Sequence, residues 1–414
     1  MASRSLADGS ATAAPPPVVA PPPGNPRFAL LDGLRAIAAL SVVALHATTY
    51  TNDFHGWQGA YARQLAAGVT VFFLLSGFLL YRPFVAARMT HRAPIRTRDY
   101  ARRRLLRIVP AYWLALTVLA LWPGLPGDVF GADWWRYYLF LQDFHGPTLF
   151  DGLGTAWSLG TEVTFYLVLP LYALCLDRLV RRRNARRLVT VELTVLAALS
   201  LGSLGFRAIV SSAHPNLGYT LPGTFDWFAV GMALAVVSVA IAQTGRTPRI
   251  VRLIEQRPGW CWVGAFGCLT VAAAYFQRTQ RYDAYSADPL HWVWAAIALF
   301  VLLPAVFPGK GRGAPRWLLS RSAVAWLGLI SYGIYLWHLP LVPKIGAAVH
   351  DVTGVHLTGA AGTFALFVLA AVAAVACAAA SYYLVEGPVL RFKDGFRRGR
   401  RSRPAAAPAA APGS

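Results

Sequence analysis

The sequence predicts an all-α protein that crosses a membrane about ten times. Of its 414 residues, 56% are hydrophobic and only 14% are charged, and the mean hydropathy is +0.46. This composition is typical of a polytopic membrane protein and argues against a soluble domain. Apolar runs of the length needed to cross the hydrocarbon core recur along the chain. We place them at 30–50, 66–84, 108–124, 155–177, 188–206, 225–242, 259–276, 290–307, 323–343 and 361–384.

Basic residues predict the orientation of this bundle. Of the 39 Lys and Arg residues, 32 fall in segments that face the cytoplasm if the N-terminus does, and six fall in the outer loops. Cytoplasmic loops carry such an excess of positive charge, so both termini are predicted to be cytoplasmic. The net charge of +21 is then a matter of topology, and we expect no nucleic-acid partner. The preference for Arg over Lys indicates a GC-rich bacterial genome, and hence the cytoplasmic membrane of a bacterium.

The chain divides into a transmembrane domain over 27–392 and two tails. Residues 1–26 are rich in Ala and Pro, residues 393–414 are basic and rich in Pro and Ala, and both are predicted to be disordered. The run 134–144 is apolar but too short to cross. We expect a re-entrant or interfacial helix there, because a crossing would put the arginine-rich loop 178–187 outside.

The first span carries two ionisable residues, Arg35 and His46. Ionisable groups inside a membrane are costly and are functional candidates by default. Eleven residues at about 100° each come within about 20° of three full turns, so both side chains point the same way, about 16 Å apart along the axis. The alternative is structural: Arg35 reaches the interface and His46 bonds a neighbouring helix.

Two further arginines precede the third span. Arg104 and Arg107 lie one turn apart on one helix face, at the cytoplasmic mouth of the bundle. Guanidinium groups make forked, charge-assisted bonds to phosphate, so a close pair suits a phosphate-bearing ligand. The alternatives are plain topology or contact with anionic lipid.

The fourth span places an acid, Glu162, at a depth similar to that of His46. A carboxylate beside an imidazole fixes its tautomer and makes it a better general base. We therefore expect these two side chains to pair, although a purely structural contact is the alternative. The ninth span adds a second intramembrane histidine, His338, with Ser331 and Tyr335, which favours a polar cavity.

Other polar or small residues are expected to be structural. Ser76 and Gly77 lie at mid-depth in the second span, where small residues let helices approach closely. A nucleophilic serine would need the G-x-S-x-G turn between strand and helix, which is missing. Glu192 and Asp226 lie at span ends, and we expect them to be interfacial.

Six stretches resemble one known family. They are DGLRAIAALSVVALH, FFLLSGFLLYRPF, RRRLLRIVPAYW, WSLGTEVTFYLVLP, ISYGIYLWHLPL and VEGPVLR. In this order they resemble the membrane-bound acyltransferase-3 family, whose members are similar to bacterial O-acetyltransferases of surface polysaccharides, lipid-linked sugars and macrolides. The resemblance covers residues 28 to 392. Some relatives carry a further span and a secreted SGNH domain, and we expect neither here.

The resemblance implies a set of site residues. His46 would be the catalytic histidine with Arg35 as its partner, Arg104 and Arg107 would handle acyl-CoA, and Glu162 would be the acid of W-S-L-x-x-E. Lower-ranked candidates for lining the site are Ser76, Trp157, Tyr166, Tyr335 and His338.

The predicted function is transfer of an acyl group, most simply acetyl, from acyl-CoA to a hydroxyl. His46 would act as general base, oriented by Glu162, or would carry the acyl group in a two-step route. Acyl-CoA is expected as co-substrate, with no permanently bound cofactor and no metal. The acceptor is left open among a surface glycan, a lipid-linked sugar and a macrolide. The rival from another class is a secondary transporter with a proton-relaying His/Glu pair; a scaffold without catalysis is disfavoured by the intact His46 and Glu162.

Overall fold

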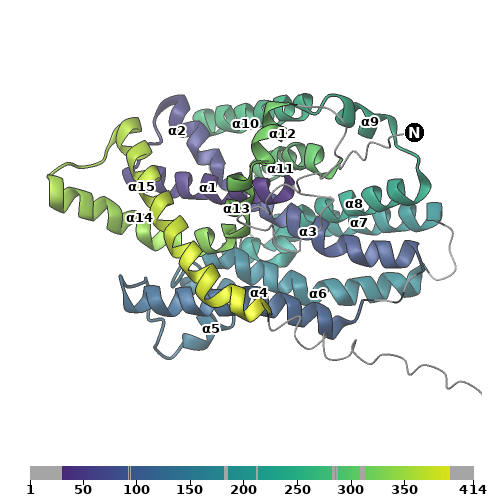
Figure 1. Ribbon diagram of the computed structural model, residues 1–414, viewed down its shortest axis with the longest axis horizontal. Helices are drawn as coiled ribbons and strands as arrows, with labels where there is room; N and C mark the ends of the chain where they lie inside the picture. The colour runs from purple at the N-terminus through teal and green to yellow at the C-terminus, as the bar shows by residue number, and fades with distance from the viewer. Residues whose placement is uncertain are drawn as a thin grey trace, which may run out of the picture.

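The computed structural model describes residues 30–91, 93, 95–180, 185–210, 213–281, 285, 288–307 and 313–391. Both predicted tails fall outside these residues. The described residues form helices and turns without any strand, so the all-α prediction is confirmed. Figure 1 shows the long helices packed side by side as one bundle.

Eight helices of the described residues are long and apolar enough to cross a membrane. They contain the following elements: α1 (Leu30–Thr51), α3 (Ala67–Met89), α4 (Thr97–Leu121), α6 (Trp157–Leu179), α7 (Ala185–Val210), α8 (Leu221–Thr244), α10 (Gly259–Thr279) and α15 (Gly359–Ser381).

Two more elements complete the match to the ten predicted spans. A ninth crossing forms if α13 (Ser322–Leu329) and α14 (Ser331–Thr353) count together, although they meet at a bend of 69°. The remaining predicted span is α11 (Leu290–Val306), a shorter apolar helix of 17 residues. Each predicted span therefore falls on one of these helices.

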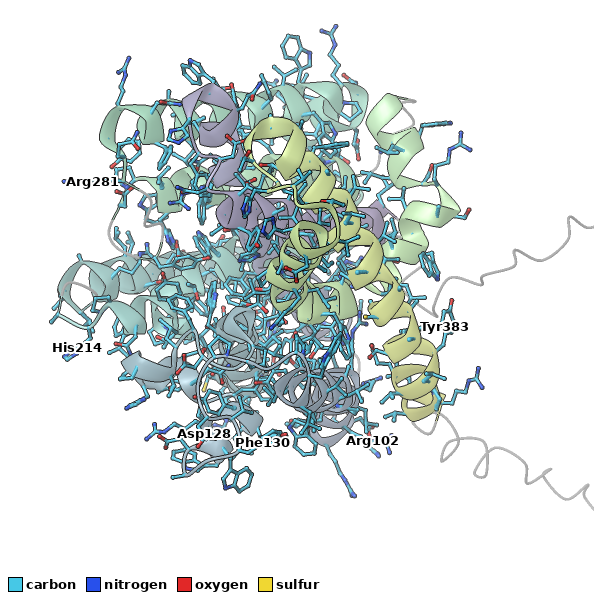
Figure 2. The ribbon with its side chains drawn as sticks, turned by 90° about the vertical axis from the view of Figure 1, so that its left-hand side faces the viewer. Arg102, Asp128, Phe130, His214, Arg281 and Tyr383 are labelled. Atoms are coloured by element: carbon cyan, nitrogen blue, oxygen red, sulfur yellow. The ribbon has the colours of Figure 1, made fainter. Side chains whose placement is uncertain are left out.

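Shorter helices lie between the long ones in the sequence. They are α2 (Gly56–Arg63), α5 (Trp134–Tyr138), α9 (Arg249–Gln256) and α12 (Ala314–Leu319). In Figure 1, α2, α5 and the turn between α14 and α15 lie toward one end, and α9 lies toward the other. Figure 2 views the molecule along this direction, with Asp128, Phe130 and His214 at the rim of the bundle.

The helix predicted near 134–144 is shorter than expected. It ends at Tyr138, and Phe140 then adopts a φ of 60°. That left-handed conformation is unfavourable for a residue with a side chain and does not continue a right-handed helix. The chain goes on in 3₁₀ turns at Gln142–Phe144, Gly146–Thr148 and Gly154–Ala156, which fold back against the bundle.

Close packing of α3 against α8 confirms the structural interpretation of Gly77. A Cβ atom on Gly77 would lie 2.2 Å from the carbonyl oxygen of Phe228, and one on Gly231 would lie 2.0 Å from that of Leu74. No side chain fits at such distances. The two glycines therefore let the helix backbones touch, as small residues do between membrane helices.

The expectation that Glu192 and Asp226 are interfacial is wrong. Glu192 is fully buried and pairs with Arg88, while Asp226 is 2% exposed. One carboxylate oxygen of Asp226 lies 3.0 Å from Nη1 of Arg207, and the other lies 2.7 Å from Nε2 of His291. Each acid is held by a base on a neighbouring helix, and such pairing is what makes a buried carboxylate tolerable.

Candidate active site

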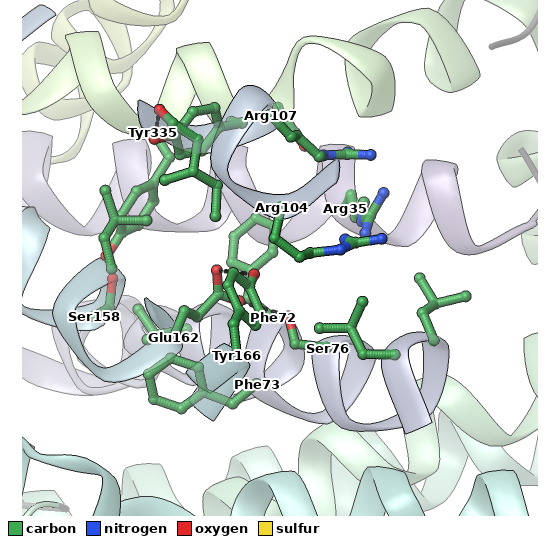
Figure 3. A pocket seen from close by; sticks show the side chains of 17 residues that line it. Arg35, Phe72, Phe73, Ser76, Arg104, Arg107, Ser158, Glu162, Tyr166 and Tyr335 are labelled. Carbon is green, nitrogen blue, oxygen red and sulfur yellow. Dashed lines mark hydrogen bonds between the residues drawn. The ribbon is translucent and has the colours of Figure 1, made fainter. Parts of the chain in front are cut away.

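Three arginines gather around a narrow cavity between α1, α3, α4, α6 and α14. We call it the arginine cavity; its volume is about 80 Å³. Figure 3 shows the guanidinium groups of Arg35, Arg104 and Arg107 turned toward the same side. The full lining is Arg35, Val69, Phe72, Phe73, Ser76, Leu79, Leu80, Arg104, Arg107, Ile108, Ser158, Leu159, Glu162, Tyr166, Ser331, Tyr332 and Tyr335.

The charges of the arginine cavity do not balance. Its lining holds three arginines against one acid, Glu162. Arg35 lies 3.6 Å from Asp32, but Arg104 and Arg107 form no ion pair within the described part of the chain. Nε of Arg104 is buried and makes no hydrogen bond there. Partly buried cations without partners are costly, so this arrangement suits an anionic ligand.

Glu162 is held by two hydroxyl donors on the floor of the arginine cavity. Ser76 donates from Oγ to Oε1 at 2.5 Å, and Tyr166 donates to Oε2 at 2.8 Å (Figure 3). The Ser76 hydroxyl is therefore engaged in a hydrogen bond to a carboxylate. Trp157 packs edge-on against Phe73 with ring centroids 6.1 Å apart and lines neither cavity described here.

His46 lies in a second and larger space, which we call the histidine cavity. Its volume is about 550 Å³, and its lining is mostly apolar, with Lys344 as the one residue of fixed charge. The lining consists of His46, Thr49, Tyr50, Gly124, Leu125, Pro126, Phe150, Gly152, Gly154, Leu339, Pro340, Val342, Pro343 and Lys344.

The predicted pairing of His46 with Glu162 is wrong. Nδ1 of His46 lies 2.9 Å from Nε2 of His338, while both oxygens of Glu162 are used in the arginine cavity. The depth was miscounted because α6 begins inside the protein. Thr155 and Ala156, which precede it, are buried at 3% and 0% exposure, so the acid five residues into α6 lies deeper than its count suggests.

Tyr335 stands at the boundary between the two cavities. It lines the arginine cavity and its hydroxyl shares a hydrogen bond of 2.8 Å with Oγ of Ser158. Its ring centroid lies 5.8 Å from that of His338 and 5.9 Å from that of Phe72. Its ring thus lies between the lining of the arginine cavity and His338, the partner of His46.

Two helices run from one cavity to the other. α1 contributes Arg35 to the arginine cavity and His46 to the histidine cavity. α14 begins at the arginine cavity with residues 331–335 and continues along the histidine cavity with residues 339–344. The eleven-residue spacing seen in the sequence therefore joins two different sites on one rigid element.

A buried polar pair behind the site was missed from the sequence. Gln142 and Asp143 are 0% and 1% exposed, and their side-chain polar atoms make no hydrogen bond to described residues. Oδ2 of Asp143 lies where a side chain on Gly160 would begin, 2.4 Å from an ideal Cβ. Burial raises the pKa of the Asp143 carboxyl well above its usual range. Nothing in the sequence indicated this pair, because the apolar run 134–144 was expected to be one helix, whereas the helix ends at Tyr138 and Gln142 and Asp143 lie in the turn that follows.

The geometry supports two-substrate chemistry. One cavity holds Arg104 and Arg107, which form no ion pair within the described residues, and the other holds an imidazole in a mainly apolar space. An imidazole is a common general base in group-transfer sites.

Residues 28–383 match the family described as "Acyltransferase domain". The putative peptidoglycan O-acetyltransferase YrhL of Bacillus subtilis is 28% identical over 391 residues, 89% of this chain and 55% of that protein. The peptidoglycan O-acetyltransferase OatA of Listeria monocytogenes is 25% identical over 392 residues, 88% of this chain and 56% of its own. A putative O-acetyltransferase of Staphylococcus aureus is 21% identical over 75% of this chain and 50% of its own.

The chain thus spans about half the length of these relatives. No solved structure matches it. Because the family match covers most of the residues, including both helices that join the two cavities, this chain belongs to the membrane-bound acyltransferase-3 family.

Proposed function

We propose that the protein is an integral membrane O-acyltransferase that moves an acyl group, most simply acetyl, from acyl-CoA to an acceptor hydroxyl. The carrying observation is that α1 joins an arginine cavity to a histidine cavity. The first suits an anionic donor and the second presents a base in a space large enough for part of an acceptor. Family membership and the O-acetyltransferase names of the relatives support the same reaction class.

The arginines of the arginine cavity bind the donor, acyl-CoA. Coenzyme A carries phosphates, and Arg104 and Arg107 are free to bind them because they have no ion pair in the described residues. The predicted topology puts the start of α4 at the cytoplasmic face, where coenzyme A is made. Arg35 lies in the same cavity, so its role is donor binding rather than partnership with His46.

The reaction is carried out at His46. Its ring accepts the proton of the acceptor hydroxyl while the hydroxyl oxygen attacks the thioester carbonyl carbon. The new ester C–O bond forms, the C–S bond breaks, and the coenzyme A thiolate takes the proton back from the imidazolium. The donor arm must pass Tyr335 to reach His46, and about 16 Å along α1 separates the two ends of this path.

The acceptor is received in the histidine cavity. Its apolar walls and single lysine suit a sugar or other polyol with an apolar face and an anionic group near the hydroxyl. The printed names of two relatives refer to peptidoglycan, so a surface glycan is the first acceptor to test, before a lipid-linked sugar or a macrolide. The site of action is the cytoplasmic membrane of a bacterium.

A secondary transporter with a direct His46–Glu162 proton relay is not favoured. The two side chains line different cavities and share no hydrogen bond. A transporter built on this chain would need another route for protons.

The test is release of free thiol from acetyl-CoA by the full chain in detergent, with glycan oligomers, lipid-linked sugars and macrolides as acceptors. His46→Ala is compared with His350→Ala, a histidine on the same α14 that holds His338 but outside both cavities. Wild type and His350→Ala should release thiol only with an acceptor, and His46→Ala should lose at least about 100-fold. Equal release by all three would remove His46 from the mechanism. Absence of acetyl-CoA binding, with solute flux in liposomes, would favour the transporter.

A further inference from the structure

We propose that His338 is a positioning residue that fixes the tautomer of His46, so that Nε2 of His46 faces the acceptor hydroxyl. This inference rests on the proposed function for its kinetic consequence, but the tautomer itself is a property of the protein alone. The structural basis is a chain of hydrogen bonds from the backbone of α14 through His338 to His46.

The first link sets the proton on His338. Nδ1 of His338 lies 3.1 Å from the carbonyl oxygen of Ile334 and 3.0 Å from that of Tyr335. Carbonyl oxygens only accept hydrogen bonds, so Nδ1 must be the protonated nitrogen. His338 is 0% exposed, so both of these contacts are buried inside the protein.

The second link transfers this choice to His46. In a neutral His338 ring, a proton on Nδ1 leaves Nε2 as an acceptor. Nε2 lies 2.9 Å from Nδ1 of His46, so Nδ1 of His46 must donate. The lone pair of His46 is then on Nε2. His46 lines the histidine cavity, and Nδ1 is the ring nitrogen that faces His338.

Charge considerations favour this neutral arrangement at rest. Two imidazolium rings 2.9 Å apart could not share one hydrogen bond, because both facing nitrogens would carry protons. Among the described residues, no carboxylate forms a hydrogen bond or ion pair with either ring, and Glu162 is engaged by Ser76 and Tyr166. When His46 accepts the acceptor's proton on Nε2, its Nδ1–H bond to His338 stays intact and strengthens as the ring becomes charged.

This role resembles what a carboxylate does in better-known triads, with a difference in charge. A neutral histidine orients the base and selects its tautomer without placing a fixed negative charge beside it. Loss of the acceptor atom at position 338 would leave His46 free to rotate and to exchange tautomers. The base would then be wrongly presented in part of the molecules, while donor binding in the arginine cavity would be unaffected.

The experiment compares three substitutions on α14 in the full chain. His338→Phe removes the acceptor atom but keeps a ring, His338→Gln keeps an oxygen that can accept from His46, and His350→Phe is the matched control outside both cavities. For acetyl transfer, His338→Phe should lower kcat about 10- to 1,000-fold with KM for acetyl-CoA within about twofold of wild type. His338→Gln should recover at least a tenth of wild-type kcat, and His350→Phe should match wild type.

The second readout does not need activity. Nitrogen-15 NMR of histidine-labelled protein separates the two neutral tautomers, and His46→Asn identifies the His46 signals by their loss. Wild type and His338→Gln should show His46 protonated on Nδ1, and His338→Phe should show a mixture or the other tautomer. A wild-type signal for His46 protonated on Nε2 overturns the proposal.

Other outcomes are equally decisive. Equal loss of kcat in His338→Phe and His338→Gln, with the His46 tautomer unchanged in both, would make the role of His338 one of packing and overturn the proposal. If no acceptor is acetylated by wild type while the tautomer result is as expected, the proposed function fails and the assignment of the His46 proton stands.

Discussion

The arginine cavity and the histidine cavity share two helices but differ in almost every physical property. The first has a volume of about 80 Å³ and gathers three arginines and an acid. The second has about 550 Å³ and presents one lysine and one histidine in apolar surroundings. Under the proposed function, this difference would be a division of labour: the fixed charge of the first cavity would hold the donor, and the second cavity would receive the acceptor at a neutral base.

The largest effect should come from removing the unpaired charge of the arginine cavity. Arg104→Gln combined with Arg107→Gln should lower kcat/KM for acetyl-CoA about 100-fold or more, because hydrogen bonds between charged groups contribute roughly 1.5–3 kcal/mol each. KM for the acceptor should stay the same. Initial-rate kinetics with each substrate varied separately measure this, with Arg102→Gln on the exposed side of α4 as the control. A matching rise in the acceptor KM would abolish the distinction between the cavities.

Filling the histidine cavity should have the converse effect. Thr49 lines it one turn after His46, and Thr49→Trp should lower kcat/KM for the acceptor about 10-fold or more by occupying its space. Equilibrium binding of acetyl-CoA should be unchanged. Thr353→Trp, at the exposed end of α14, is the matched control. Weaker acetyl-CoA binding in Thr49→Trp would mean that the donor also occupies this space.

Glu162→Gln tests whether this acid acts in the arginine cavity or in the histidine cavity. Because its oxygens accept from Ser76 and Tyr166 in the arginine cavity, the variant should change the affinity for acetyl-CoA several-fold, about 3- to 10-fold. The tautomer and NMR signals of His46 should be those of wild type. A shifted His46 signal would restore a direct link between the two residues.

The smallest effect concerns Asp143, which supports the start of α6 from behind. Its pKa is raised on folding, so the folded state binds this proton more tightly than the unfolded chain. The resulting stabilisation is complete at acidic pH and is lost as the pH rises above the unfolded value of about 3.9. Asp143→Asn should therefore raise Tm at pH 8 by about 1–3 °C, with the gain shrinking at pH 5. Thermal unfolding in detergent measures this, with Asp351→Asn at the exposed end of α14 as the control. A constant or opposite difference would place the proton elsewhere.

Periodicity and apolar length predicted much of this molecule. Each of the ten predicted spans falls on a helical segment, and eight helices of the described residues, or nine spans if α13 and α14 count together, are long and apolar enough to cross a membrane. Arg35 and His46 were correctly placed on one helix, and Arg104 and Arg107 one turn apart on another. Both relations depend on local helix geometry alone. Gly77 was correctly expected at a close helix crossing.

Apart from the short helix near residue 134, the errors concern contacts between segments far apart in the chain. His46 and His338 are separated by 292 positions, and nothing local indicates that their rings meet. Glu162 was paired with the wrong residue because the buried turn before α6 shifts its depth. Asp226 and Glu192 were expected at the surface because their bases, Arg207 and Arg88, lie on other helices. Helix pairing decides these contacts, and apolar periodicity does not encode which helices pair.

The walls of the histidine cavity come mostly from three short stretches of the chain. Apart from one turn of α1, its walls come from residues 124–126, 150–154 and 339–344. These are two loop stretches and half a helix, whereas the arginine cavity is set into the helices of the bundle. If the histidine cavity receives the acceptor, as proposed, exchanging these three short stretches should change the acceptor preference and leave the helices around the arginine cavity intact. They would then be the units to graft when a new acceptor preference is designed onto this scaffold.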